Sequence, residues 1–436
     1  VPRYTSYPTA PNFSDKISNN IYTSWLKNLD KDKEISLYIH IPFCNSLCYF
    51  CGCHTNVANT YAPIESYVNS LLREIALLGE ELRNKFNVSH IHFGGGTPSI
   101  LRGAELWMIM LSIKKNFNIL ENCEIAMEID PRFYKKNLTT ILNKYGFNRI
   151  SIGVQDFSKD VQTLTNRIQS FKTTKKIVKH FRENKISNIN IDLMYGLPKQ
   201  TVRTFSDTLK KIVTLEPDRI SIFGYGHVPW KKKHQKLIGD ELLNNESRLK
   251  FYQLASRYFL SNGYEAFGID HYAKKSSSIV QKAKEKKLQR NFQGYSEDSA
   301  EILIGIGASS ISYLPKGYVQ NIAQVDEYIS SLKENKLPIL RGHEFRAKDR
   351  IYGTIIKELM CYLSVDLNQV AEKFEKNINL FLPNVKKLQP FVDAGCVNFE
   401  NHTLSIKPEA RPLVRNICSA FDQYFKPEKN KYSFGI

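Results

Sequence analysis

Four of the eight cysteines of this 436-residue chain lie within ten residues of one another. Cys44, Cys48 and Cys51 have C-x3-C-x2-C spacing, and Cys53 follows two residues later. Structural zinc sites usually take four ligands in two separated pairs, and although Cys53 could be a fourth ligand, it stands only two residues beyond Cys51. A 4Fe–4S cluster held by three thiolates, with its fourth iron open, fits this spacing better.

An iron without a protein ligand can bind the amino and carboxylate groups of S-adenosylmethionine. One electron passed to the sulfonium then breaks the C5′–S bond and releases a 5′-deoxyadenosyl radical. The protein positions the reacting groups and excludes competing reactions. Glycines 94–96 follow a short apolar run, and there the backbone can approach the methionine end of this cosubstrate; the alternative is an ordinary tight turn. Glu128, near the end of the next run, could accept hydrogen bonds from ribose hydroxyls.

These residues stand at the ends of apolar runs that alternate with stretches of helical periodicity, the clearest of them over 63–85. The runs are 35–41, 90–93, 124–129, 149–154, 188–194 and 219–223. Strands alternating with helices predict βαβ units, a parallel sheet and right-handed crossovers. Six units are too few for a closed eight-stranded barrel, so we expect a partial (β/α)6 barrel whose strand ends gather the polar residues at one mouth.

The expected fold class is therefore α/β, a partial barrel followed by a mainly helical, winged-helix-like C-terminal domain. We expect an N-terminal segment over 1–30 at the barrel mouth, the catalytic barrel over 31–340 and the C-terminal domain over 346–436. In the last, helical segments precede a hairpin at 396–407 and a closing helix at 408–424. The stretch 229–340 mixes helices with loops and is harder to assign.

The formal net charge of +18 could indicate nucleic acid, a membrane surface or a small polyanionic substrate. The lysines are scattered, and no RNA-binding motif or group of stacking aromatics is visible. No apolar run reaches the roughly 18 residues of a membrane span, and the first residues lack the apolar region of a signal peptide. We therefore expect a cytoplasmic monomer without a nucleic-acid or membrane partner.

Short motifs recur along nearly the whole chain. They are 2–9 (PRYTSYPT), 38–44 (YIHIPFC), 48–53 (CYFCGC), 94–98 (GGGTP), 153–157 (GVQDF), 166–167 (NR), 190–200 (NIDLMYGLPKQ), 268–272 (GIDHY), 290–295 (RNFQGY) and 415–418 (RNIC). Together they resemble the oxygen-independent coproporphyrinogen III oxidase (dehydrogenase) family of the radical S-adenosylmethionine superfamily. This family has a partial (β/α)6 barrel and converts two propionates of coproporphyrinogen III to vinyls, giving protoporphyrinogen IX in heme biosynthesis.

The resemblance also implies roles for individual residues. Cys44, Cys48 and Cys51 would hold the 4Fe–4S cluster, whereas Cys53 matches a family cysteine that is not a ligand. The first S-adenosylmethionine would contact Tyr38, Gly95 and Glu128. A second would contact Phe50, Gly96, Thr97, Gln155, Arg167, Asp192, Gly226 and Ile311. Gly226 departs from the alanine usual in the family, which weakens that contact, and an Arg167–Asp192 ion pair across the barrel rim is the alternative to a second cosubstrate.

The substrate is a tetra-anion, so a basic site is expected, and arginine matches a carboxylate best. Arg3, Lys199 and Arg290 are the candidate substrate-binding residues. A low-potential donor such as flavodoxin or ferredoxin would supply electrons. The alternatives are a heme chaperone of the same superfamily, whose members generally lack the start motif and the Cys53 equivalent, and a radical methyltransferase or RNA-modifying enzyme.

Overall fold

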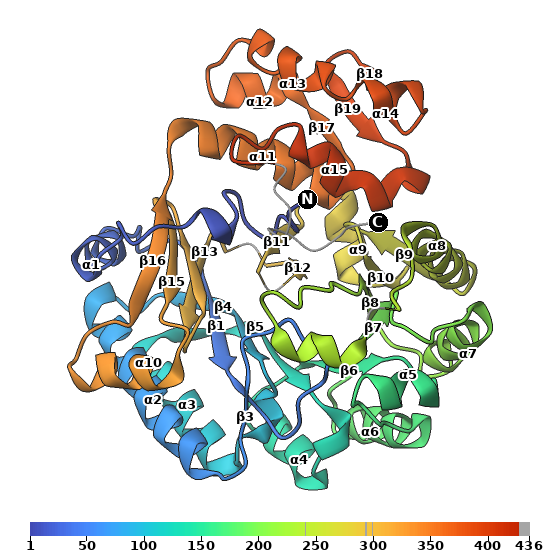
Figure 1. Cartoon of the computed structure of the whole chain (residues 1–436). Coiled ribbons are helices and arrows are strands. Elements are labelled where there is room, and N and C mark those ends of the chain that lie inside the picture. The colour runs from blue at the N-terminus through green and yellow to red at the C-terminus, as the bar shows by residue number, and fades with distance from the viewer. Residues whose placement is uncertain (240, 293, 299, 427–436) are drawn as a thin grey trace.

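The computed structural model describes residues 1–239, 241–292, 294–298 and 300–426. Predictions for Gln293 in the 290–295 motif and for residues 427–436 lie outside these ranges. The described chain builds a curved barrel sheet wrapped by helices, with a smaller mainly helical part above its open side (Figure 1). In this part of the chain, no helix is both long and apolar enough to cross a membrane.

All six predicted strands are confirmed, and they pair side by side in parallel. They are β1 (Ile35–Ile41), β4 (Asn87–Gly95), β5 (Asn118–Ile129), β6 (Arg149–Gln155), β7 (Asn188–Tyr195) and β8 (Arg219–Gly224). The helices of this part are α1 (Asn19–Lys27), α2 (Ala62–Leu82), α3 (Gly103–Asn116), α4 (Lys136–Lys144), α5 (Lys159–Leu164), α6 (Phe171–Glu183) and α7 (Val202–Val213). The predicted helix at 63–85 ends early, because Arg83 takes the left-handed conformation with φ +59°.

The stretch 229–340 is richer in strands than its sequence indicated. It contains α8 (Asn245–Ser261), β9 (Tyr264–Phe267), β10 (His271–Lys274), α9 (Ser278–Lys284), β11 (Gln289–Asn291), β12 (Gly294–Ser296), β13 (Ile302–Ile306), β14 (Ile311–Leu314), β15 (Gly317–Asn321), α10 (Val325–Lys333) and the start of β16 (Ile339–Glu344). β13 pairs in parallel with β1, and β14, β15 and β16 extend that edge antiparallel. At the other edge, β10 and β9 follow β8.

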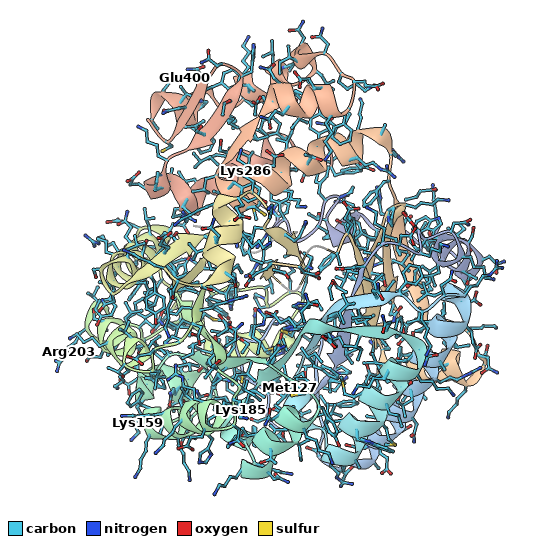
Figure 2. The ribbon with its side chains drawn as sticks, turned by 180° about the vertical axis from the view of Figure 1, so that it is seen from behind. Met127, Lys159, Lys185, Arg203, Lys286 and Glu400 are labelled. Carbon is cyan, nitrogen blue, oxygen red and sulfur yellow. The ribbon has the colours of Figure 1, made fainter. Side chains whose placement is uncertain are left out.

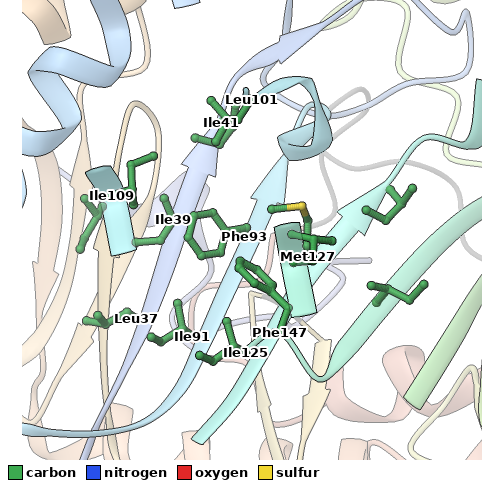
Figure 3. Close-up of a cluster of buried hydrophobic side chains, with 14 of the residues drawn as sticks. Leu37, Ile39, Ile41, Ile91, Phe93, Leu101, Ile109, Ile125, Met127 and Phe147 are labelled. Carbon is green, nitrogen blue, oxygen red and sulfur yellow. The ribbon is translucent and has the colours of Figure 1, made fainter. Parts of the chain in front are cut away.

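The barrel strands are apolar on one face and polar on the other, because side chains alternate along a strand. Ile39, Phe93 and Met127 on neighbouring strands share an apolar layer with Ile109 of α3 (Figure 3). Burying each such side chain stabilises the fold by roughly 1.5–3 kcal/mol. The opposite face carries the polar residues between these positions, among them Tyr38, His40, His90, His92, Glu124 and Glu128. The barrel interior is therefore polar, which suits a site rather than a packed core.

Glu74 of α2 ties the closing strand to the helical layer. Its carboxylate, 1% exposed, accepts hydrogen bonds from Gly307 N (2.7 Å), Asn321 Nδ2 (2.6 Å) and the Tyr328 hydroxyl. These three donors lie after β13, on β15 and on α10, so one buried side chain connects the added strands to the barrel. Burial raises the pKa of Glu74 to about 7, although the three hydrogen bonds that it accepts act to lower that pKa.

The C-terminal part contains the predicted helices and the predicted hairpin. Its elements are α11 (Ala347–Tyr362), β17 (Ser364–Asp366), α12 (Leu367–Lys373), α13 (Leu382–Lys386), α14 (Gln389–Asp393), β18 (Val397–Glu400), β19 (Thr403–Ile406) and α15 (Val414–Ser419). β18 and β19 form the hairpin, and β17 adds a third antiparallel strand. The single closing helix expected at 408–424 is wrong: a 3-10 turn containing Pro412 precedes the short α15, because proline lacks the N–H that an α-helix needs.

The N-terminal arm, residues 1–9, passes between the barrel and the C-terminal part (Figure 1). The Tyr4 hydroxyl donates to Asp422 Oδ2 (3.0 Å), and Gln423 N donates to the Tyr7 hydroxyl (2.9 Å). Chain segments from opposite ends of the sequence thus hold each other in place. Three exposed basic residues, Lys159, Lys185 and Arg203, lie out on the helical side of the barrel (Figure 2).

Candidate functional site

The carboxyl ends of the barrel strands open into a cavity of about 680 Å³, here called the barrel cavity. Loops from six strands contribute to it, together with the N-terminal arm and the β11–β12 hairpin. Of the predicted site residues, its lining includes Arg3, Cys44, Cys48, Phe50, Cys51, Gly95, Gly96, Thr97, Glu128, Gln155, Arg167, Asp192, Gly226 and Arg290. Residues spread over much of the sequence therefore meet in one space, as expected for strand ends of a parallel sheet.

The loop after β1 carries the three spaced cysteines, and donors point at each sulfur. Cys44 Sγ accepts from Thr55 Oγ1 (3.0 Å) and Thr97 Oγ1 (3.3 Å). The Cys51 sulfur accepts from the Cys53 backbone N–H (3.4 Å), and a hydrogen bond from the Cys53 thiol is the main cause that lowers the pKa of Cys51 to about 6. Such donors favour thiolates, the form that binds metal, although burial outweighs them at Cys44 and raises its pKa.

Two arginines face the middle cysteine. Arg132 Nη2 lies 3.2 Å and Arg167 Nη1 lies 3.4 Å from Cys48 Sγ. Asp130 joins the two guanidiniums, with its Oδ2 2.7 Å from Arg132 and 3.4 Å from Arg167. Burial opposes ionisation of Asp130, but Arg167 and then Arg132 outweigh it and hold the pKa of Asp130 below its usual value.

Among the described residues, no three His, Cys, Asp or Glu side chains converge on a point where a single metal ion could bind. The three thiols line the barrel cavity, and each sulfur has at least one hydrogen-bond donor.

The glycine loop after β4 lies against polar side chains from the barrel interior. Gly95 has φ +115°, and a Cβ there would come within 2.6 Å of the His40 ring. Gly95 N donates to Glu128 Oε2 (3.3 Å), and His92 Nε2 lies 3.2 Å from Glu128 Oε1. A Cβ on Gly96 would come within 2.7 Å of Phe43 O. Only glycine fits here, so the backbone is open to the cavity where side chains would otherwise stand.

Asp192 of β7 is held by neighbours on its own sheet. Ser151 Oγ donates to Asp192 Oδ2 (2.7 Å) and Asn190 Nδ2 donates to Asp192 Oδ1 (2.8 Å). Burial raises the pKa of Asp192, and the nearby Glu128 charge adds to this. Since Arg167 pairs with Asp130, the alternative of an Arg167–Asp192 ion pair is not what the structure contains.

Three predicted residues do not line the barrel cavity. Tyr38 lies beneath the glycine loop, with its hydroxyl 3.1 Å from His40 Nδ1. Ile311 begins β14 and pairs with Gln320. Lys199 is exposed and its Nζ lies 3.4 Å from Glu241 Oε2.

A basic wall closes the side of the cavity that faces the N-terminal arm. Arg290 donates to the backbone carbonyls of Arg3 and Tyr4, both at 3.3 Å, and Arg415 Nη2 lies 3.4 Å from Asp270 Oδ2. The roles of Asp130, Arg132 and Arg415 escaped the sequence reasoning. The Asp-Pro-Arg that follows the third strand was the available signal, but a sequence does not show that both arginines turn toward one cysteine.

Comparison with known proteins gives consistent matches. Residues 38–212 match the model of the radical SAM superfamily, and residues 345–413 match the HemN C-terminal domain. A Bradyrhizobium diazoefficiens protein named oxygen-independent coproporphyrinogen III oxidase is 40% identical over 437 residues, covering 100% of this chain and 97% of that protein. The protein of that name from Escherichia coli is 35% identical, covering 99% of this chain and 95% of that protein.

A solved structure agrees with these matches. The structure of coproporphyrinogen III oxidase (HemN) from Escherichia coli, described as a radical SAM enzyme, superposes with a TM-score of 0.93 at 35% identity. The match covers 97% of this chain and 98% of that chain.

Proposed function

Because this chain belongs to the family of oxygen-independent coproporphyrinogen III oxidases, within the radical SAM superfamily, we propose that it oxidatively decarboxylates two propionates of coproporphyrinogen III to vinyls, giving protoporphyrinogen IX for heme biosynthesis. The observation that carries this proposal is the 40% identity to the Bradyrhizobium diazoefficiens relative named oxygen-independent coproporphyrinogen III oxidase, over 100% of this chain and 97% of that protein. The barrel cavity supports it, since cysteines, open backbone and basic residues meet there.

The family uses a 4Fe–4S cluster and S-adenosylmethionine, and the residues present fit both. Cys44, Cys48 and Cys51 would hold the cluster, because their sulfurs line the cavity and receive donors that stabilise thiolates. Cys53 would remain unliganded. When bound, the cluster and S-adenosylmethionine would supply the one-electron radical chemistry that removes a hydrogen atom from a propionate.

The remaining residues of the site would bind and orient. Tyr38, Gly95 and Glu128 would hold the first S-adenosylmethionine, with the Glu128 carboxylate placed by Gly95 N and His92 to accept ribose hydroxyls. We further propose a second molecule. Its contacts would be Phe50, Gly96, Thr97, Gln155, Arg167, Asp192, Gly226 and Ile311. All but Ile311 line the cavity, which makes Ile311 the least supported of them.

Two cosubstrates match the stoichiometry, since each radical oxidises one propionate. To become a vinyl, each propionate would lose one hydrogen atom to the radical and then carbon dioxide and one electron, and a one-electron acceptor would take up that electron. Arg3 and Arg290 line the barrel cavity, which supports a role for them in binding an incoming carboxylate, whereas the exposed, paired Lys199 has little support. A low-potential donor such as flavodoxin or ferredoxin would supply the electron for cleavage.

We also propose a cytoplasmic monomer. All eight cysteines are unpaired, which suits a reducing compartment.

The test is an anaerobic assay of the reconstituted protein with coproporphyrinogen III, S-adenosylmethionine and a reductant. We expect the divinyl product with loss of two carboxylates, and no turnover in air. Cys44→Ala is the control, because it should lose the cluster. Tight heme binding without conversion would favour a heme chaperone, and methyl transfer would favour a radical methyltransferase; either result would overturn the proposal.

A further inference from the structure

A second cavity, of about 450 Å³, adjoins the barrel cavity and is not used by the reaction as described so far. It is here called the arm cavity, because residues 4–7 of the N-terminal arm form one of its walls. Thr5, Arg290 and Phe292 line both cavities. A bound molecule long enough to pass these three residues would therefore occupy both spaces at once.

One wall of the arm cavity is a continuous group of aromatic rings from the extended edge of the sheet. The Tyr318 ring lies 6.0 Å from Phe292, 5.2 Å from Tyr313 and 5.2 Å from Phe345, measured between ring centroids. Tyr313 and Phe345 are themselves 5.9 Å apart. This wall offers aromatic faces and edges to a large apolar ring system.

The C-terminal part contributes a group of cations to the lining of the cavity. Arg350 and Lys357 of α11 and Lys373 of α12 line it. Arg350 donates to Pro315 O (2.7 Å) and Lys357 to Gln289 Oε1, but over the described ranges no carboxylate forms an ion pair with any of the three. Burial lowers the pKa of Lys357, and the nearby Glu301 and Glu358 offset this only in part.

The two acids that line the cavity are engaged elsewhere. Glu301 Oε2 lies 3.4 Å from Lys33, and Asp349 Oδ2 lies 2.8 Å from His343 Nε2. Asp349 also accepts from the Tyr424 hydroxyl through its other oxygen. The cavity therefore combines an aromatic wall with three cations that, within the described ranges, have no carboxylate at ion-pair distance.

We propose that the arm cavity binds the half of the tetrapyrrole that does not react, with its rings against the aromatic wall and its two retained carboxylates paired with Lys357 and Arg350. This inference rests on the proposed function. The substrate offers pyrrole ring faces to the aromatic wall and carries its carboxylates at the rim, as the cavity requires. The barrel cavity must already take the cluster, the two proposed cosubstrate molecules and the reacting propionate, and the shared residues let the remaining half extend into the arm cavity.

The proposed binding mode can be tested by comparing two porphyrins that differ in their number of carboxylates. Coproporphyrin III has four carboxylates, while protoporphyrin IX keeps only the two that do not react, and both air-stable porphyrins can report binding by fluorescence. We expect Lys357→Gln and Arg350→Gln each to weaken binding of both porphyrins to the holoenzyme, by the same factor of about ten, since each removes one charge-assisted contact. Lys348→Gln, an exposed site on the same helix, is the matched control and should change neither affinity.

The iron content and melting temperature of each variant must match those of the wild type. Lys357→Arg should keep the affinity of the wild type, because it keeps the charge. Unchanged affinity for both porphyrins would overturn the inference. So would a loss confined to coproporphyrin, because the two residues would then hold the reacting carboxylates. In either case, conversion of coproporphyrinogen by the wild type keeps the proposed function intact, whereas a wild type that neither converts nor binds these molecules refutes that function itself.

Discussion

Glu74 gives a stability prediction whose sign and size follow from its surroundings. Its folded-state pKa is about 7, against an ordinary value of 4.5. Between pH 6 and pH 8 the unfolded carboxyl is ionised throughout, while the folded one passes from mostly protonated to mostly ionised. The folded state holds the extra proton, so stability falls as pH rises through this window. Two pH units centred on the folded pKa correspond to roughly 1.4 kcal/mol.

The substitution Glu74→Gln removes this titration. Glutamine cannot accept from all three donors at once, so the variant should also be less stable by an amount that does not change with pH. We expect urea unfolding followed by circular dichroism to show a wild-type stability loss between pH 6 and pH 8 that is about 1.4 kcal/mol larger than the loss in the variant. Glu80→Gln, an exposed position on the same helix, is the control and should keep the wild-type pH dependence.

If wild type and Glu74→Gln lose the same stability between these pH values, Glu74 is not protonated in the folded protein near neutrality. The reasoning from burial would then be refuted, because three hydrogen bonds would have been enough to hold a buried carboxylate ionised.

Three further predictions concern the barrel cavity. Cys53→Ala should keep about four irons per chain in an anaerobic iron assay, whereas Cys51→Ala should lose them, since only the latter removes a proposed ligand. Arg132→Gln should lower the cluster reduction potential by on the order of 50 mV in an EPR-monitored titration, because a cationic donor to Cys48 is lost; an unchanged potential would contradict this. Arg167→Ala should spare the iron content but cut vinyl formation at least tenfold, as a lost charge-assisted contact is worth about 1.5–3 kcal/mol.

The barrel core was predictable because its strands are buried on a regular pattern. The run from Ile35 to Ile41 and its five partners alternate with amphipathic helices, and that alternation admits few arrangements. β13 was missed because it lies in the stretch 229–340, where no regular alternation of strands and helices marks it, and because it pairs with β1, far away in the sequence. Its place is fixed by tertiary contacts such as those of Glu74, which leave no local pattern.

The site, like the fold, could be predicted from the sequence only in part. Cysteine spacing and the glycine loop are local signals, and both led to the barrel cavity. Lys199 was chosen only for its charge, yet it is exposed and paired with Glu241. The convergence of Arg132 and Arg167 on Cys48 depends on how two separate loops fold back, so residue type and spacing alone could not reveal it.

The hydrogen bonds between the N-terminal arm and residues 422 and 423 have a consequence for the order in which the protein folds during synthesis. Tyr4 and Tyr7 are translated more than 400 residues before Asp422 and Gln423, the groups that hold them. The barrel strands are translated in between and fold as a unit before these partners exist. Until residues 422 and 423 have been made, the arm lacks both of these contacts and is held by fewer groups, among them Arg290. We therefore expect the cysteine loop to be easier to reach for cluster assembly before residues 422 and 423 fold back onto the arm.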